Sequence, residues 1–270
     1  MILFEFEKLY RAKVLFRPSK IIKSPYVADI KIWGKEEQLL GHSPALGCCG
    51  LIEKNEYVYV RKLCGKTKCR YQICLAELKT KGEKVLVGVF PRSAELIAKK
   101  AILSGLIPEL DVQTLESEKK HLNSRFDYDG ILKNGNPFIC EVKNVPLADY
   151  ADVTATQRKK MDFSDFKYND KIAYFPDGYR KKKSDPVSPR ATKHINELLE
   201  IKKKHPHFCC VLLFVIQRDD ASSFQPSRLD LTYLEAIRRA SKGGVLIKTI
   251  QVKWRKNKAY YVRNDLPINL

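Results

Sequence analysis

The chain has 270 residues, of which 44% are hydrophobic and 30% are charged, so its composition is that of a folded protein and excludes general disorder. A chain of this length exceeds one typical domain, and we expect two hydrophobic cores. Its 50 Lys and Arg residues against 31 Asp and Glu residues give a formal net charge of +19, which favours a polyanionic partner such as a phosphate backbone. A proteome generally rich in lysine would give the same excess, so charge alone does not identify the partner.

The cysteines and the apolar segments predict the cellular compartment of the protein. Eight cysteines are spread along the chain and include two adjacent pairs, Cys48-Cys49 and Cys209-Cys210, which fits a reduced compartment better than a disulfide scaffold. Charged residues interrupt the apolar ones in segment 1–16, and no later run reaches the roughly 20 apolar residues of a membrane span. We therefore expect a cytoplasmic protein without a membrane partner, or a nuclear one if the source is a eukaryote.

Residues 1–84 are expected to form the first domain, a small β-barrel. Alternating apolar and polar residues predict short strands over 9–16, 28–33, 56–62 and 71–78, with turns between them. Short strands with such punctuation are typical of a small barrel, and the oligonucleotide-binding (OB) type is one candidate. Three tyrosines of this domain have two possible roles: Tyr57, Tyr59 and Tyr71. In a barrel of the OB type they would form a stacking surface for single-stranded bases, and the alternative is packing in the core or at an edge.

Residues 85–270 are expected to form the second domain, which mixes strands and helices. It begins with a strand over 85–90 and a helix over 94–103, for which Ser93 is the predicted cap. Strands over 124–132 and 138–143 follow, joined by Lys133-Asn134-Gly135-Asn136, a strong hairpin signal. The polar segment 149–185 predicts loops or an insertion.

The rest of the second domain predicts a buried sheet with helices. Ser188-Pro189 begins a helix that ends near residue 204. The continuous apolar run 211–216 predicts a strand buried on both faces of a parallel or mixed sheet. A helix over 231–241 and strands over 245–254 and 259–262 complete an α/β domain. The predicted fold class is therefore α+β, with a small barrel followed by an α/β domain.

Three polar residues of the predicted hairpin carry the strongest chemical signal. Successive side chains of a strand point to opposite faces, so Glu141 and Lys143 share a face, and the hairpin brings Asp127 across from them. Two carboxylates suit Mg²⁺ or Mn²⁺, and a lysine beside them would orient or deprotonate the water that attacks a phosphodiester. Glu118 would complete the acidic set. A cross-strand ion pair on a solvated face has the same spacing and is the alternative.

Several segments of the chain resemble the sugar fermentation stimulation protein family. They occur in the family's order and cover most of the chain, most densely from Gly105 to Pro226. The segments are Gly105-Leu106-Ile107-Pro108-Glu109-Leu110, Asn123-Ser124-Arg125-Phe126-Asp127, Cys140-Glu141-Val142-Lys143-Asn144-Val145-Pro146-Leu147, Phe175-Pro176-Asp177, Lys193-His194-Ile195-Asn196-Glu197-Leu198, and 211–217 followed by Phe224 and Pro226.

The resemblance implies a fold and a site. The implied fold is an N-terminal OB-type barrel followed by a domain similar to restriction-endonuclease-like nucleases of the PD-(D/E)xK type, with DNA as the partner. In that nuclease pattern Asp127 and Glu141 match the metal ligands, with Mg²⁺ or Mn²⁺ as the implied cofactor. Lys143 matches the catalytic lysine, and Glu118 matches the additional acid.

Basic residues near this hairpin and beyond it are the expected contacts to nucleic-acid phosphates. Arg190 and His194 lie four residues apart and share a face of the predicted helix, with Lys193 beside them. Arg125, two residues before Asp127, is placed with them. An exposed basic run would hold a backbone independently of sequence, or act as a nuclear address: Arg180, Lys181, Lys182 and Lys183. A solvated charged surface is the alternative for each of these residues.

The predicted function is DNA binding with a metal-dependent, nuclease-like domain that would hydrolyse phosphodiester bonds. The first alternative is a non-catalytic DNA-binding or regulatory protein that uses the same fold as a clamp. The second is an RNA-binding factor that uses the barrel and the basic runs without a metal. Phosphate-backbone contacts would make binding largely independent of sequence in all three.

Overall fold

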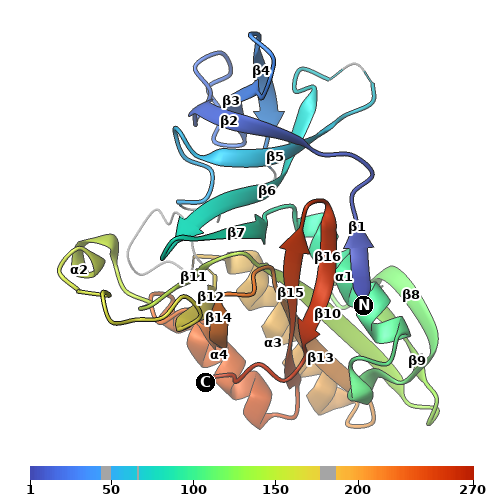
Figure 1. Ribbon diagram of the computed structural model, residues 1–270. Helices are drawn as coiled ribbons and strands as arrows, with labels where there is room; N and C mark the ends of the chain where they lie inside the picture. Colours follow the sequence, from blue (N-terminus) through green and yellow to red (C-terminus); the bar gives the residue numbers. More distant parts are fainter. Residues whose placement is uncertain (44–49, 66, 177–186) are drawn as a thin grey trace.

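The structure is a computed structural model that describes residues 1–43, 50–65, 67–176 and 187–270. A barrel of strands stands over a larger α/β layer structure, and the hairpin of β15 (Leu246–Arg255) and β16 (Lys258–Arg263) rises toward the barrel (Figure 1). This arrangement confirms the predicted fold class.

The barrel is built from β2 (Tyr10–Phe16), β3 (Val27–Ile32), β4 (Gln38–His42), β5 (Tyr57–Lys62) and β6 (Tyr71–Thr80). Antiparallel pairs join β2 to β3, β3 to β4, β2 to β5 and β5 to β6, and a parallel pairing of β4 with β6 closes the barrel. That connectivity is the five-stranded Greek key of the OB type. Alternate residues such as Val58 and Val60 fill the interior, as the alternation in the sequence predicts.

Two strands link the barrel to the rest of the chain. β7 (Glu83–Gly88) pairs with β6, so the predicted boundary between residues 84 and 85 falls inside a strand of the barrel sheet. β1 (Ile2–Glu5) pairs with β16 and is an edge strand of the second sheet. Strands from each end of the sequence therefore lie side by side, which no local pattern predicts.

The second sheet has seven strands in the order β1-β16-β15-β13-β10-β9-β8. At its centre, β13 (Cys209–Ile216) lies parallel to both β10 (Pro137–Val145) and β15. Residues 210–216 are fully buried, which confirms the two-sided burial predicted from the apolar run. The hairpin of β9 (Ser124–Leu132) and β10 is also confirmed, with β8 (Val112–His121) as its outer neighbour.

Helices cover both faces of this sheet. α1 (Pro91–Leu103) packs in one core cluster with β1, whereas α3 (Pro189–Lys204) and α4 (Leu231–Lys242) pack in the cluster on the other face. The prediction of a Ser93 cap is wrong, because the helix begins at Pro91 and the Ser93 hydroxyl donates back to the Phe90 carbonyl at 2.6 Å. Proline already supplies the helical φ at the first position, where no N–H is needed.

The polar segment 149–185 contains more regular structure than predicted. β12 (Lys171–Phe175) pairs with β11 (Ala148–Asp149) and, in parallel, with β14 (Ala221–Pro226), forming a separate three-stranded sheet. A short helix, α2 (Ala155–Arg158), and a 3-10 turn (Pro108–Leu110) complete the elements. Within the described ranges, no helix has the length and apolar character needed to cross a membrane.

The junction between the barrel sheet and the second sheet is a buried polar network around Gln217. Its Oε1 accepts from Trp254 Nε1 at 2.9 Å, and its Nε2 donates to Asn144 Oδ1 at 2.7 Å. Gly88 at the end of β7 lies so close that a Cβ there would meet Gln217 Oε1 at 2.1 Å. The fit of β7 against the second sheet therefore requires a glycine.

Gly88→Ala is expected to lower the free energy of unfolding by about 1–3 kcal/mol, because the added methyl group overpacks a buried contact. Urea denaturation measures this loss. The same substitution in a Gln217→Ala background should cost less, because the closest contact is then absent and only the contact with Trp254 Nε1 at 2.7 Å remains of the three nearest. An equal cost in both backgrounds would contradict the proposed contact.

Candidate active site

The β9–β10 ladder opens at the residues predicted to carry chemistry. Its last paired residues are Cys140 and Tyr128, and the next two across the strands are Glu141 and Asp127. Val142 no longer pairs with β9, and its backbone N–H donates to Asp127 Oδ2 at 2.7 Å instead. The two carboxylates thus lie where the strands separate, on opposite sides of one opening.

Glu141 is buried with a specific set of partners. Its Oε1 accepts from Lys143 Nζ and contacts His194 Nδ1 at 2.5 Å, whereas its Oε2 has no hydrogen-bond partner among the residues that the structure describes. Burial opposes ionisation, but the charges of Lys143 and His194 outweigh it and hold the pKa of Glu141 below its usual value. A buried, ionised carboxylate with one unused oxygen is suited to binding a cation.

Asp127 has the opposite electrostatic environment. Burial first, and then the charge of Glu141, raise the pKa of Asp127 to about 7, against the lowering effects of the Val142 N–H and Lys143. Two carboxylates this close repel each other unless a proton or a cation lies between them. Asp127 and Glu141 therefore fit a divalent cation, which would replace the proton that the pair otherwise favours.

A residue of this site that the sequence analysis missed is Glu95 on α1. Burial, together with the charges of Glu118 and Glu141, raises its pKa, and an ion pair with Arg92 opposes the rise. The hydroxyl of Tyr128, next to Asp127, donates to the Glu95 backbone carbonyl at 2.8 Å and ties α1 to β9. No sequence signal links Glu95 to the hairpin, because the two meet only through tertiary packing.

Glu118 lies at the outer edge of this group. It adopts φ +60° on β8 and pairs with Arg92 at 3.3 Å and with Arg125 at 3.6 Å. Its side chain is 52% exposed, so it contributes to an acidic surface held by two arginines. Its direct contacts are to those arginines.

The predicted phosphate contacts separate into four groups. Arg190 Nε donates to His194 Nε2 at 3.5 Å, and His194 in turn contacts Glu141, so these two residues belong to the site. Lys193 points elsewhere and donates to the Asn123 carbonyl at 2.8 Å. Arg125 is exposed beside Glu118. The basic run lies outside the described residues: Arg180, Lys181, Lys182 and Lys183.

Across the described ranges, no three His, Cys, Asp or Glu side chains group in a way that would hold a metal ion by themselves. A cation at Asp127 and Glu141 would therefore take its other ligands from backbone, water or a phosphate oxygen. Such a site, partly completed by water and substrate, is typical of Mg²⁺ in phosphoryl chemistry.

An OB-type barrel followed by a restriction-endonuclease-like domain defines the class of protein. The model of the sugar fermentation stimulation protein RE domain matches residues 92–258. The chain therefore belongs to the sugar fermentation stimulation protein family.

Known relatives agree with this assignment along most of the chain. A sugar fermentation stimulation protein homolog of Pelagibacter ubique is 31% identical over 87% of this chain and 88% of its own length. The homolog of Idiomarina loihiensis is 25% identical over 98% of this chain and its full length. The structure of Pyrococcus furiosus SfsA in complex with Ca²⁺ has a TM-score of 0.75 at 20% identity over both whole chains, and shows the same fold.

Proposed function

We propose that this protein binds DNA and cleaves its phosphodiester bonds with the help of Mg²⁺ or Mn²⁺ held by Asp127 and Glu141. The observation that carries the proposal is the buried Glu141, paired with Lys143 and placed across from Asp127 where two strands separate. An ion pair that served stability alone would not need a second carboxylate with a raised pKa. The Ca²⁺ complex of the Pyrococcus furiosus relative further supports a divalent cation.

Each side chain has a role in this proposal. Asp127 and Glu141 hold the cation, which when bound would neutralise phosphate charge and polarise the attacking water. The ammonium of Lys143 orients that water or stabilises charge on the phosphate. His194 holds the same Oε1 of Glu141 that Lys143 contacts, and the exposed Arg190 beside His194 contacts a phosphate oxygen.

The test is incubation of labelled single- and double-stranded DNA with the protein in Mg²⁺, Mn²⁺ or chelator, beside Asp127→Asn. Cleavage should require the metal and fall at least about 100-fold in the variant, because one of two ligands loses its charge. DNA binding should persist or strengthen, because a charge that repels phosphate is removed.

A matched control is Asp111→Asn, which removes an exposed carboxylate paired with Lys133 at 2.7 Å. This variant should cleave like the parent protein. Metal-dependent cleavage that survives Asp127→Asn would place the chemistry elsewhere and overturn the assignment.

A non-catalytic DNA clamp is the second candidate, and the lack of a three-ligand group among the described side chains favours it. In this case DNA binds without cleavage in every metal, and Arg190→Ala lowers affinity and reduces the salt dependence. Direct competition between RNA and DNA distinguishes the third candidate, an RNA-binding factor.

A further inference from the structure

The barrel carries an exposed aromatic platform far in sequence from the carboxylates. Trp33, just after β3, is 70% exposed, which is unusual for such a large apolar ring. The Arg11 guanidinium lies 5.3 Å from the Trp33 ring and 4.0 Å from the Tyr57 ring. Glu77 holds that guanidinium with a hydrogen bond of 2.8 Å to Nη2. Trp33 and Tyr57 are thus ordered around a fixed cation, with a large flat face open to solvent.

The platform continues along the barrel toward the second sheet. Glu77 also accepts from the Tyr59 hydroxyl at 3.0 Å, and Lys84 Nζ approaches that hydroxyl at 3.3 Å. Tyr59 and Lys84 in turn line a groove of about 550 Å³ between the barrel and the β15–β16 hairpin. Tyr71, the third ring considered in the sequence, is buried and does not take part.

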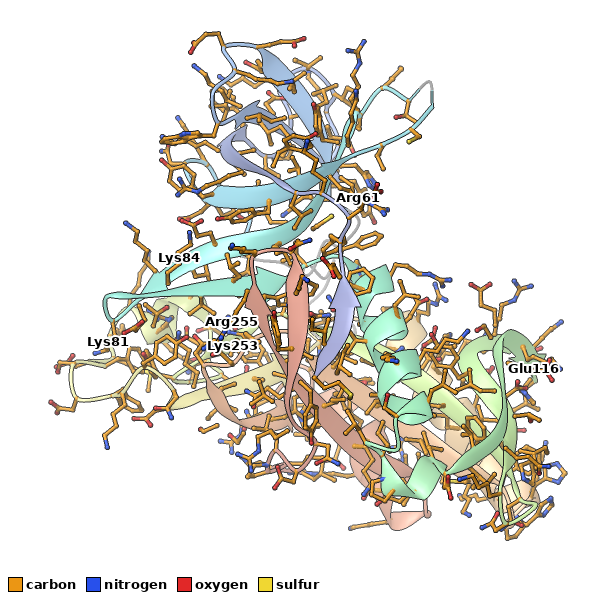
Figure 2. The ribbon with its side chains drawn as sticks, turned by 45° about the vertical axis from the view of Figure 1, so that its right-hand side comes forward. Arg61, Lys81, Lys84, Glu116, Lys253 and Arg255 are labelled. Atoms are coloured by element: carbon orange, nitrogen blue, oxygen red, sulfur yellow. The ribbon has the colours of Figure 1, made fainter. Side chains whose placement is uncertain are left out.

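The groove is strongly basic. Lys84 from the barrel faces Lys253 and Arg255 from the hairpin, and Figure 2 shows the three in the region between β7 and the hairpin. Lys84 and Lys253 are paired with carboxylates, at 2.7 and 2.5 Å. Arg255 and Lys256 at the hairpin tip are exposed and have no carboxylate partner among the described residues. These two charges are available to an anionic ligand.

We propose that this surface, the aromatic track formed by Trp33, Tyr57, Tyr59, Lys84, Arg255 and Lys256, binds a single-stranded polynucleotide. A duplex hides the faces of its bases, so an exposed indole can stack only on unpaired ones. The tip cations supply phosphate contacts next to the rings. The inference rests on the nucleic-acid part of the proposed function and does not depend on cleavage.

The track leads toward the candidate active site. Glu7 and Lys8 line both the groove and a neighbouring hollow of about 590 Å³, which Arg92 of α1 also lines. Arg92 pairs with Glu118 and with Glu95, and the charge of Glu95 acts on Asp127. An unpaired strand on the barrel would therefore extend toward the carboxylates, so the substrate class of the site would be DNA with a single-stranded region.

The test uses the full chain in chelator with an oligo-dT strand, an oligo-U strand and a blunt duplex of equal length. The protein has two tryptophans, Trp33 and the 4%-exposed Trp254 that also lines the groove, so the quenching that is lost in Trp33→Ala is the part that reports on Trp33. The expected result is quenching by the single strands and none by the duplex. Duplex binding equal to single-strand binding, or binding without quenching, would overturn the proposal. Stronger binding of oligo-U would identify the occupant as RNA.

Variants test the two halves of the track separately. Trp33→Ala should lower single-strand affinity at least fivefold, the effect of losing one stacked base. Arg255→Ala with Lys256→Ala should lower the slope of log affinity against log salt by roughly 1.4, for two phosphates on a single strand. The charge-matched control is Arg239→Ala with Lys242→Ala on α4, at the other end of β15, which should bind normally. If the control variant lost as much affinity and salt dependence, net charge alone would explain the effect, and the hairpin tip would not be a phosphate-binding site. These binding measurements are made in chelator, without metal. Their outcome therefore does not depend on whether the protein cleaves DNA at Asp127 and Glu141.

Discussion

Lys143→Met is expected to lower the rate of metal-dependent DNA cleavage about a thousandfold, the scale of losing a positioned proton-transfer group or charge in an active site. Affinity for the metal should stay the same or rise. The reason is that the Lys143 ammonium pairs with Glu141 Oε1 and so competes with a cation for that carboxylate. Single-turnover cleavage, beside a calorimetric Mn²⁺ titration, measures both quantities.

The separation of rate from metal affinity distinguishes a catalytic lysine from a structural one. If Lys143 served only to neutralise Glu141, the variant would cleave normally once metal was bound. Lys193→Met is the matched control, because this lysine is 51% exposed on α3 and contacts the Asn123 carbonyl and, at 3.7 Å, Glu197. Its cleavage rate should stay within about twofold of the parent protein.

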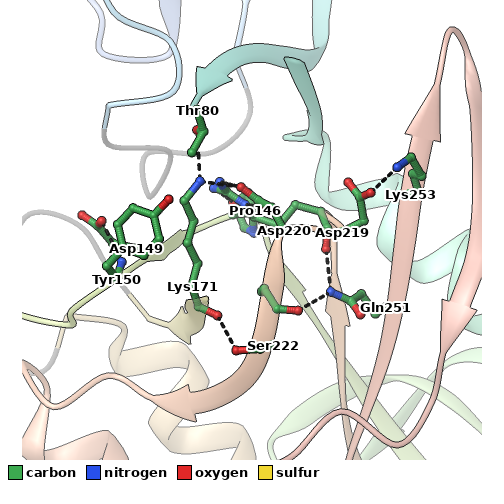
Figure 3. Close-up of polar contacts among 12 residues, drawn as sticks. Thr80, Pro146, Asp149, Tyr150, Lys171, Asp219, Asp220, Ser222, Gln251 and Lys253 are labelled. Carbon is green, nitrogen blue, oxygen red and sulfur yellow. Dashed lines mark hydrogen bonds and ion pairs between the residues drawn. The ribbon is translucent and has the colours of Figure 1, made fainter. Parts of the chain in front are cut away.

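Asp220→Ala is expected to destabilise the protein by about 3–5 kcal/mol, because it leaves two buried cations without a counter-charge. Asp220 is fully buried and accepts from Arg218 Nε at 2.6 Å and Nη2 at 2.8 Å. It also accepts from Lys171 Nζ at 2.5 Å (Figure 3). Lys171 also donates to Thr80 Oγ1 at 3.0 Å. The cluster therefore joins β6 of the barrel to the three-stranded sheet. Urea denaturation followed by circular dichroism measures the loss.

Asp219→Ala is the control for this substitution, because the neighbouring carboxylate pairs with the more exposed Lys253 and with no other cation in the described part of the chain. Its cost should be about 1 kcal/mol or less. Adding Lys171→Met to Asp220→Ala should recover part of the lost stability, because one unpaired cation is then removed. If both aspartate variants lost the same stability, the cluster would not be the cause.

The same cluster predicts how stability depends on pH. Burial favours the neutral form of Asp220, but Arg218 and Lys171 outweigh it and hold its pKa below the usual value. Its contribution is therefore fully present above about pH 4, the usual pKa of an unfolded aspartate, and is lost as the pH falls through the lowered native value. In Asp220→Ala this part of the acid sensitivity should be absent.

Sequence reasoning succeeded where the signal was local. Lys133-Asn134-Gly135-Asn136 predicted the hairpin, and strand alternation then brought Asp127 and Glu141 together. Helical spacing placed Arg190 and His194 on one face, and the structure adds that His194 contacts Glu141. Periods of two and 3.6 residues are sufficient for such inferences.

It failed where position depends on packing between distant segments. Glu95 reaches the site only because α1 packs on the sheet that holds the hairpin. The strands β12 and β14 are short and begin or continue with polar residues such as Lys171, whose burial depends on Asp220, 49 positions away. The platform at Trp33 is likewise invisible to patterns, because Arg11, which orders it, is held by Glu77, 66 positions away.

The pairing of β1 with β16 constrains the order in which the molecule can be completed during synthesis. All the barrel strands and β7 emerge from the ribosome before every strand of the α/β sheet except β1, and domains generally fold as they appear. β1, however, must wait for residues 258–263 before it finds its neighbour. A fragment that starts at residue 85 would leave the β16 edge uncovered, and open strand edges promote aggregation. The barrel and the α/β domain are therefore architecturally distinct but tied together by β1, which precedes the barrel in the chain and pairs with β16, a strand made after the barrel.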